Sequence, residues 1–288
     1  MRSFDFEEPE RLDDALGLLA GHGPDAALLA GGQSLLILMR QRLAAPGVLV
    51  SLGRVAGLRR VVRTGDGLVL GAMTTYASLA ATTEVTTGWG LLATAASRVG
   101  SPHIRVRGTI GGSLCHADPA GDVPVALIAL DAAIMVAGPG GTRRIAADGF
   151  ATGLFRTGLR AGELLESIEL PAQPPTTTVG FERFCLREGE LPLAQAAVRL
   201  TWDGDVVREA RVAVGGGGPC PARMTGAEMV LAGARRGQPS TVDGVREAAR
   251  AAARPFADVR GSAAWKRDVV AAVVARAVAS ALEDPSHA

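Results

Sequence analysis

The sequence predicts an α+β protein of two domains, and three features of the chain support this fold class. Helix and strand patterns alternate around two glycine-rich turns in the first part of the chain. Residues 171–178 contain three prolines and three threonines, a composition typical of a linker. Beyond them, three strand patterns come first and helical patterns dominate the rest, which is the segregated order expected of an α+β domain. At 288 residues the chain is long enough for two separate cores.

The first 52 residues predict a small unit of alternating helices and strands. Leucine and alanine recur at helical spacing over 8–23, and Pro9 suits the first turn of such a helix. The unit continues with a strand over 25–30, a turn at Gly31-Gly32-Gln33-Ser34, a helix over 35–42 and a strand over 48–52.

The segment up to the linker predicts a hairpin, several helices and a pair of strands. Asp66-Gly67 is typical of a tight hairpin turn, and Thr74 or Thr75 suits the N-terminal cap of a helix that ends at Leu79. The predicted elements are strands over 59–63 and 68–72, the capped helix, a helix over 91–99, a glycine-rich turn at 109–113, a helix over 125–131, and strands over 133–137 and 142–146.

After the linker we expect an antiparallel sheet followed by helices. Asp203-Gly204-Asp205 is a turn that joins the last two of three strand patterns. The final helix carries alanine and valine on a face suited to burial. These elements are strands over 180–186, 194–202 and 206–215 and a helix over 263–282.

The composition excludes several classes of protein. The 30 basic and 29 acidic residues nearly cancel and aromatic residues make up only 4%, so we expect no nucleic-acid partner. No apolar run approaches the roughly 18–20 residues needed to span a bilayer, and the first residues lack the features of a signal peptide, so we expect a cytoplasmic protein. Cys115, Cys185 and Cys220 are too scattered for a disulfide framework or a zinc site. We expect free thiols, and any iron–sulfur centre would belong to another chain.

Two glycine-rich segments are the strongest candidates for a binding site. Residues 30–34 (AGGQS) leave a strand and enter a helix, and residues 109–113 (TIGGS) follow about 80 residues later. Glycine lets backbone N–H groups surround a phosphate, and a helix N-terminus favours an anion. Either pair of glycines alone is also compatible with a structural turn, and neither matches the Rossmann or Walker spacing. The run over 116–124 (HADPAGDVP) adds two carboxylates next to the second segment.

Three segments together resemble the FAD-binding medium subunit of the molybdenum hydroxylases, which include carbon monoxide dehydrogenase and the xanthine dehydrogenase-type enzymes. They are LLAGGQSL (28–35), GTIGGSLCHADPAGDVP (108–124) and ELLESIELP (163–171), and the resemblance extends over nearly the whole chain. It implies an α+β fold with a two-subdomain FAD-binding region of the PCMH/vanillyl-alcohol-oxidase type, the dinucleotide lying between the subdomains. A CO dehydrogenase flavoprotein-type C-terminal domain of a three-stranded antiparallel sheet and helices would follow. The implied limits are 1–175 (subdomains about 1–55 and 56–175) and 176–288.

The resemblance implies an oxidoreductase subunit that binds FAD without a covalent bond. A large partner subunit would oxidise the substrate at a molybdopterin cofactor, and a small partner subunit would carry two [2Fe–2S] clusters. FAD in this chain would accept electrons from those clusters and reduce a small-molecule acceptor such as NAD, oxygen or a quinone. The assembly would be a dimer of heterotrimers, and the substrate pocket would lie in another chain.

The resemblance assigns FAD contacts residue by residue. Residues 30–34 and 109–113 would hold the pyrophosphate through backbone and hydroxyl donors, and Asp122 would be the aspartate that contacts FAD. Leu165 and Arg183 would lie near the flavin, although a core leucine and a solvated strand arginine explain them equally well. The full set is Leu29, Ala30, Gly31, Gly32, Gln33, Ser34, Leu35, Thr109, Ile110, Gly111, Gly112, Ser113, His116, Asp122, Leu165 and Arg183.

The sequence departs from the family pattern at several positions. Gln33 stands where many relatives have His, and Ser113 where many have Asn, but each replacement can form hydrogen bonds. Residues 50–53 (VSLG) lack the usual Asp and Asn, and residues 187–192 (REGELP) lack the commoner Gly-Asp pair. These differences concern the domain junction and leave the glycine segments intact.

Several residues near the motifs keep more than one interpretation. His103 and His116 either line a cofactor cleft as polar groups or act as a general base or point of flavin attachment. Tyr76 either approaches the isoalloxazine ring or packs beneath it, and we interpret Cys115 as a small buried residue.

Two other functions are compatible with the sequence. A stand-alone FAD-dependent oxidoreductase on the same scaffold would bind its own substrate over the isoalloxazine ring, and the absence of neighbouring genes for large and small subunits would favour it. A subunit that has lost FAD and only supports a complex is the other alternative. The intact AGGQS and TIGGS segments argue against it.

Overall fold

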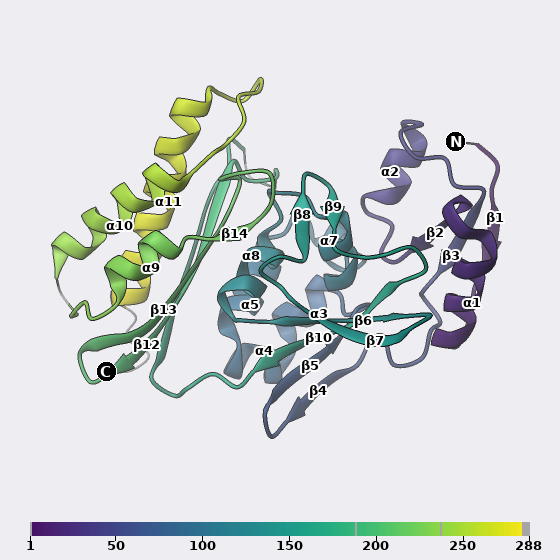
Figure 1. Cartoon of the computed structure of the whole chain (residues 1–288), viewed down its shortest axis with the longest axis horizontal. Helices are drawn as coiled ribbons and strands as arrows, with labels where there is room; N and C mark the ends of the chain where they lie inside the picture. Colours follow the sequence, from purple (N-terminus) through teal and green to yellow (C-terminus); the bar gives the residue numbers. More distant parts are fainter. Residues whose placement is uncertain (1, 188, 237, 284–288) are drawn as a thin grey trace.

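The chain forms three adjacent blocks along its long axis (Figure 1). The computed structural model describes residues 2–187, 189–236 and 238–283. An N-terminal unit, a middle block built on a five-stranded sheet and a C-terminal block built on a four-stranded sheet follow one another in sequence and in space.

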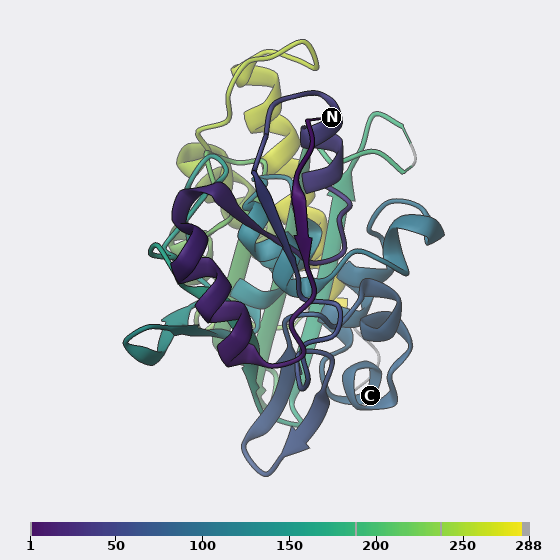
Figure 2. The same ribbon diagram turned by 90° about the vertical axis from the view of Figure 1, so that its right-hand side faces the viewer.

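The N-terminal unit is a parallel three-stranded sheet with α1 packed beside it. Its elements are β1 (Asp5–Glu7), α1 (Leu12–His22), a 3-10 turn (Gly23–Asp25), β2 (Ala26–Leu29), α2 (Leu35–Arg40) and β3 (Val48–Ser51), in the strand order β1-β3-β2. Figure 2, in which this unit faces the viewer, shows α1 to one side of the strands. The prediction that Pro9 opens the first helix is wrong, because Arg11 is extended and the helix begins at Leu12.

The middle block holds an antiparallel sheet in the order β4-β5-β10-β6-β7, with helices packed on one face. Thr75 caps α3 as predicted, since its hydroxyl accepts a hydrogen bond from Ser78 N. The strand patterns miss the central strand β10, because a bulge between Leu165 and Ser167 interrupts the alternation of side chains. The elements are β4 (Val61–Thr64), β5 (Gly67–Gly71), α3 (Tyr76–Ala81), α4 (Thr83–Gly88), α5 (Gly90–Ser97), α6 (Pro102–Arg105), α7 (Ile110–His116), α8 (Asp122–Ala129), β6 (Ala133–Gly138), β7 (Gly141–Ala146), β8 (Ala151–Gly153), β9 (Arg156–Thr157) and β10 (Leu164–Pro171).

Two local predictions in this block differ from the structure. Residues 109–113 are not a turn, because Thr109 caps α7 and its Oγ1 accepts a hydrogen bond from Gly112 N at 3.1 Å. The glycine pair predicts a turn because glycine is unfavourable inside a helix. Helix α8 begins at Asp122 rather than at Val125, so the Asp122 side chain belongs to the first turn of a helix.

The C-terminal block is an antiparallel sheet with α9, α10 and α11 on one face (Figure 1). A short β14 adds a fourth strand to the predicted three. The predicted linker shrinks to residues 172–176, because β10 ends at Pro171 and the next strand begins at Thr177. The elements are β11 (Thr177–Phe184), β12 (Ala194–Asp203), β13 (Val206–Gly215), β14 (Ala222–Arg223), α9 (Thr225–Leu231), α10 (Pro239–Ala252) and α11 (Ala263–Glu283). Within the described ranges, none of the helices is both long and apolar enough to cross a membrane.

Both faces of the C-terminal sheet are buried. Val198 and Val212 pack against the C-terminal helices, whereas Ala197 and Ala213 join the core of the middle block on the α5 and α8 side. Strand β12 is therefore buried along almost its whole length. This double burial places the end of the sheet against the segment that leads into α8.

An ion-pair cluster reinforces the same junction. Arg199 Nη2 and Arg211 Nε lie 2.6 and 2.9 Å from the carboxylate oxygens of Asp131, which follows α8 and has a φ of 53°. Glu209 contacts both arginines at 3.0 and 2.7 Å. The cluster joins the turn after α8 to the neighbouring strands β12 and β13.

Gly180 provides a test of the contact between β11 and α11. A Cβ at Gly180 would lie 2.0 Å from Ala277 O, so alanine at this position forces helix and sheet apart. We expect Gly180→Ala to lower the free energy of unfolding by about 2–3 kcal/mol in a denaturant titration. Gly153→Ala is the matched control in a strand, since nothing lies within 4 Å of a Cβ there, and its effect should stay within about 0.5 kcal/mol. Equal effects would contradict the tight contact.

Candidate functional site

A cavity of about 500 Å³ lies where the three blocks meet. Its walls come from the β2–α2 segment, from several separate segments of the middle block, and from β11 and the loop after it. Both glycine segments lie on this wall. The cavity therefore brings together residues that are far apart in the sequence.

Most of the residues predicted to bind a ligand line this single cavity. The exceptions are Leu29, the last residue of β2, and Ile110, which is fully buried in the core of the middle block. The predicted residues on the wall are Ala30, Gly31, Gly32, Gln33, Ser34, Leu35, Thr109, Gly111, Gly112, Ser113, His116, Asp122, Leu165 and Arg183.

The first glycine segment offers free backbone donors. Within the described part of the chain, the N–H groups of residues 31–34 donate to no protein acceptor. Gly31 packs so closely on the following wall segment that a Cβ would lie 2.1 Å from Arg107 O, and Gly32 has a φ of 73°. Glycine is therefore required at both positions by packing and backbone conformation, and the N–H groups stay available to a ligand.

The backbone N–H groups of the second glycine segment already donate hydrogen bonds within the protein. A Cβ on Gly112 would meet Thr109 Oγ1 at 2.8 Å and Ala30 Cβ at 3.6 Å, so the two segments approach each other closely. The segment offers bare glycine surface and the hydroxyls of Thr109 and Ser113, and the expected backbone donors are engaged within the protein. Their acceptors, at 2.9–3.1 Å, are Thr74 O for Ile110, Ala72 O for Gly111, Thr109 Oγ1 for Gly112 and Thr109 O for Ser113.

Tyr76 is both buried and part of the cavity wall. Gly108 makes room for its ring, since a Cβ there would lie 2.5 Å from Tyr76 Cε2. Burial raises the pKa of the phenol to about 12, against the opposing effect of its hydrogen bond with Ser113, and the charge of Asp122 raises the pKa further. Tyr76 therefore presents a neutral ring to the cavity.

Asp122 and Arg183 form a buried ion pair across the cavity wall. Arg183 Nη1 lies 3.1 Å from Asp122 Oδ2, and the side chains of Arg183 and Asp122 are 12% and 4% exposed. Arg183 also donates to Glu190 O at 2.7 Å and to Arg98 O. Among the described residues, Asp122 Oδ1 and Arg183 Nε have no hydrogen-bond partner. The interpretation of Arg183 as a solvated arginine is wrong, because the side chain joins three segments inside the molecule.

The environment of Asp122 favours its neutral form. Burial raises the pKa of this carboxyl to about 7, although the positive charges of Arg183 and Arg98 lower it. A carboxyl that titrates near neutral pH inside a cavity is typical of a functional site.

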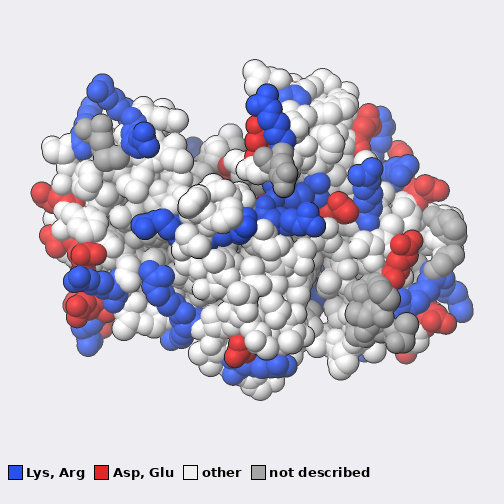
Figure 3. Space-filling model, turned by 180° about the vertical axis from the view of Figure 1, so that it is seen from behind, with Lys and Arg blue, Asp and Glu red and all other residues white. Residues whose placement is uncertain are grey.

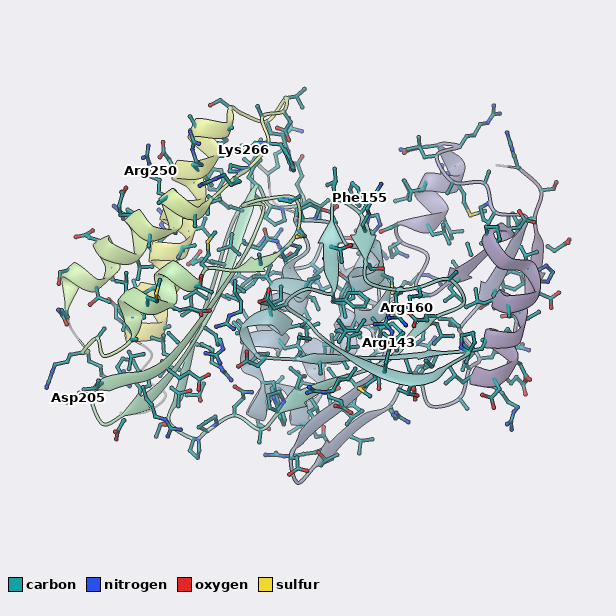
Figure 4. All side chains as sticks on the ribbon, in the orientation of Figure 1. Arg143, Phe155, Arg160, Asp205, Arg250 and Lys266 are labelled. Carbon is teal, nitrogen blue, oxygen red and sulfur yellow. The ribbon has the colours of Figure 1, made fainter. Side chains whose placement is uncertain are left out.

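The other candidate residues differ in how they lie relative to the cavity. Leu165 is 3% exposed and lines the cavity, so it is a core residue and a wall residue at once. The ring of His116 packs on Phe155 at 5.2 Å between centroids, and Figure 4 shows Phe155 at the tip of the β8–β9 hairpin. Cys115 is a free thiol on the cavity wall: its surface is accessible, yet burial raises the pKa of the thiol to about 12. His103 is exposed on α6 and does not line the cavity.

Sequence reasoning missed several parts of the wall, including two longer stretches. Residues 99–108 contribute Val99, Gly100 and Ile104, and the loop after β11 contributes residues 189–191. Arg105 Nη1 holds the first stretch in place by donating to Val99 O and Gly100 O at 3.1 and 2.8 Å. No short motif marks these contacts.

Figure 3 shows basic side chains in a band across the face opposite to that of Figure 1, which favours anionic ligands or partners there.

Comparison with known proteins identifies the family. The family described as FAD binding domain in molybdopterin dehydrogenase matches residues 2–173, and the CO dehydrogenase flavoprotein C-terminal domain matches residues 181–281. The chain belongs to the FAD-binding medium subunits of the molybdenum hydroxylases. The carbon monoxide dehydrogenase medium chain of Hydrogenophaga pseudoflava is 34% identical over 278 residues, covering 96% of each chain.

Two further relatives agree with this assignment. The 6-hydroxypseudooxynicotine dehydrogenase complex subunit alpha of Paenarthrobacter nicotinovorans is 36% identical over 285 residues, which cover 97% of this medium subunit and 95% of that protein. A solved structure of carbon monoxide dehydrogenase from Hydrogenophaga pseudoflava matches with a TM-score of 0.95 and 35% identity over 97% of both chains. The predicted fold class is confirmed, and the medium subunit is an FAD-binding component of an oxidoreductase.

The pKa of Asp122 predicts a pH dependence of stability in the cofactor-free medium subunit. Because its pKa rises from 3.8 to about 7 on folding, the folded chain holds this proton more tightly than the unfolded chain does. The free energy of unfolding should therefore fall as pH rises from about 4 to about 7. Asp122→Asn cannot ionise, so its melting temperature should gain on that of the wild type across this range. Parallel melting curves of the two proteins would contradict the raised pKa.

Proposed function

We propose that this chain is the flavin electron-transfer subunit of a molybdenum-containing hydroxylase or dehydrogenase. Bound FAD would take electrons from [2Fe–2S] clusters of a small partner subunit, after a large subunit oxidises the substrate at a molybdopterin cofactor. It would pass them to an external small-molecule acceptor. The relatives support this role, because several carry names such as medium chain or medium subunit and align over nearly their whole length.

The cavity has the chemical groups that FAD requires. The free N–H groups of residues 31–34 suit the anionic diphosphate, and the hydroxyl of Thr109 adds a donor beside them. The apolar side chains of Leu35, Leu165 and Tyr76 suit a flat ring system. We propose that these groups hold FAD without a covalent bond.

The ion pair of Asp122 and Arg183 is the observation that carries the proposal. Each side chain is almost completely buried on the cavity wall, yet Asp122 Oδ1 and Arg183 Nε lack a partner among the described residues. A buried polar atom without a partner is costly. The polar groups of FAD would complete the hydrogen bonds of both side chains.

Flavin itself supplies one-electron and two-electron transfer. The residues of this chain therefore need to bind the cofactor, orient it and exclude water from it. Tyr76 contributes a neutral aromatic ring to the cavity wall. The arrangement requires no acid–base pair. The relatives named medium chain or medium subunit favour electron transfer within a complex over a stand-alone oxidoreductase that acts on its own substrate.

The partner subunits follow from the same proposal. We infer a complex with a large molybdopterin subunit and a small [2Fe–2S] subunit, assembled as a dimer of heterotrimers. We also propose that the FAD-binding domain extends over 1–175, divided at about residue 55, and that the C-terminal domain begins at 176. The loop at 172–176 between β10 and β11 supports this boundary.

The direct test is the identity of the bound cofactor. The whole chain, alone or assembled with its partner subunits, should show a flavin absorption spectrum and release FAD when denatured by heat or acid. Release confirms that the bond is not covalent. If neither form carries or takes up FAD, a scaffold subunit without flavin becomes the better explanation.

Gly112 is the glycine that best tests the binding mode. Gly31 and Gly111 are packed against backbone atoms, and Gly32 has a positive φ, so substitutions there damage the fold directly. Gly112→Val projects a side chain beside the hydroxyl of Thr109, and we expect FAD binding to weaken at least about tenfold, the equivalent of 1.4 kcal/mol. Fluorescence titration with FAD measures the loss.

Gly17→Val is the matched control for this substitution. Gly17 lies in α1 and is exposed, and a Cβ at this position would have nothing within 4 Å. Its flavin content should equal that of the wild type. Unchanged FAD affinity in folded Gly112→Val would remove the second glycine segment from the binding site.

A further inference from the structure

Three paired residues of the C-terminal sheet face the segment that precedes α8. Arg183 on β11 pairs with Gln195 on β12, and Gln195 pairs with Gly215 on β13. Directly paired residues on neighbouring strands project on the same face of a sheet. We call Arg183, Gln195 and Gly215 the sheet rung.

Gln195 reaches from this rung to the backbone beside Asp122. Its side chain is fully buried, and Nε2 donates to Gly121 O at 3.0 Å. Within the described residues, Gln195 Oε1 has no partner. An apolar side chain would fill the same space without an unpaired oxygen, so burial alone does not explain an amide here. The amide is explained by the hydrogen bond that Nε2 donates to Gly121 O.

Gly215 makes room for this contact. A Cβ on Gly215 would lie 2.3 Å from Gln195 Nε2 and 2.7 Å from Pro119 O. Its φ is not positive, so space and not backbone conformation requires glycine. The next residue, Gly216, donates its N–H to Pro119 O at 2.8 Å. Residues 119–121 are thus held by two hydrogen bonds from the ends of β12 and β13.

We propose that Gln195 is a positioning residue of the flavin site, which fixes the direction in which Asp122 presents its carboxylate by holding Gly121 O. The inference rests on the proposed function, since FAD is the ligand that the carboxylate would meet. Arg183 holds the carboxylate of Asp122 from the same rung, at 3.1 Å. The sheet therefore grips the Gly121-Asp122 dipeptide at its backbone and at its side chain. Two such points fix an orientation that one point leaves free to rotate.

The test is a double-mutant cycle between Gln195 and Asp122, measured by FAD titration of the whole chain, alone or assembled with its partner subunits. Gln195→Leu removes the donor, and we expect FAD binding to weaken about tenfold, the effect of one lost hydrogen bond. In an Asp122→Asn background the same substitution should cause little further loss, because the two residues act through one contact. Gln195→Met keeps the chain length and should behave as Gln195→Leu does.

Thr241→Val is the control for loss of a buried polar group. Thr241 is 5% exposed on α10 and is not part of the cavity wall, so FAD affinity should be unchanged. If Gln195→Leu and Gln195→Met acted only through a general loss of stability, Thr241→Val would lower FAD binding as well. Additive effects of Gln195→Leu and Asp122→Asn would overturn the positioning role.

Hydrogen exchange of the cofactor-free chain provides a readout that does not depend on flavin. In Gln195→Leu the peptide that covers residues 117–122 should exchange faster, whereas Thr241→Val should leave it unchanged. Unchanged exchange in Gln195→Leu overturns the inference whatever the flavin result. Faster exchange with wild-type FAD affinity also overturns it but leaves the proposed function intact. A wild-type chain that binds no FAD in either form refutes the proposed function, and exchange then still decides whether Gln195 holds this segment.

Discussion

Strand β12 is buried on both of its faces, so the C-terminal sheet is covered twice. The C-terminal helices bury one face, and the helices α5 and α8 of the middle block bury the other. Separating the sheet from α8 would return the face of Ala197 and Ala213 to water, at roughly 25 cal/mol for each Å² of apolar surface. The hydrophobic contact therefore fixes the position of the sheet against α8. At one end of the sheet, Arg183 and Gln195 meet the segment before α8.

The ion pair at this junction has a different energetic character. Removing two charges from water is expensive, and their attraction repays the cost only when the remaining polar atoms are also satisfied. Here they are not, because one oxygen of Asp122 and one nitrogen of Arg183 lack partners among the described residues. The same cost raises the pKa of Asp122, because burial disfavours the charged carboxylate. A site of this kind sacrifices stability in the free protein and regains it when a ligand completes the hydrogen bonds.

The sequence predicts most of the fold, and its errors have local causes. The strands predicted over 133–137 and 142–146 correspond to β6 and β7. The hairpin turn predicted at Asp66-Gly67 lies one residue earlier, at Gly65-Asp66, because Gly67 begins β5 and pairs with Thr64. The bulge at Glu166 hides β10. Residues 109–113 predict a turn because their glycines disfavour a helix, but Gly111 has to pack on Ala72, where a Cβ would lie only 2.7 Å from its carbonyl oxygen. Propensity is here overridden by tertiary contact.

The site is less predictable than the fold, because only part of it lies in short motifs. The glycine segments carry their own signal, and the run over 116–124 indicates carboxylates beside them, including Asp122. Family resemblance alone indicates Arg183, and neither source indicates Gln195. No local pattern shows that residues on β11, β12 and the α8 segment meet. A ligand that contacts all of these elements stabilises their arrangement by mass action. By the same linkage, any change that loosens the sheet from α8 must weaken the binding of that ligand. In the proposed site, flavin affinity therefore depends on the docking of the C-terminal sheet against α8 as well as on the glycine segments.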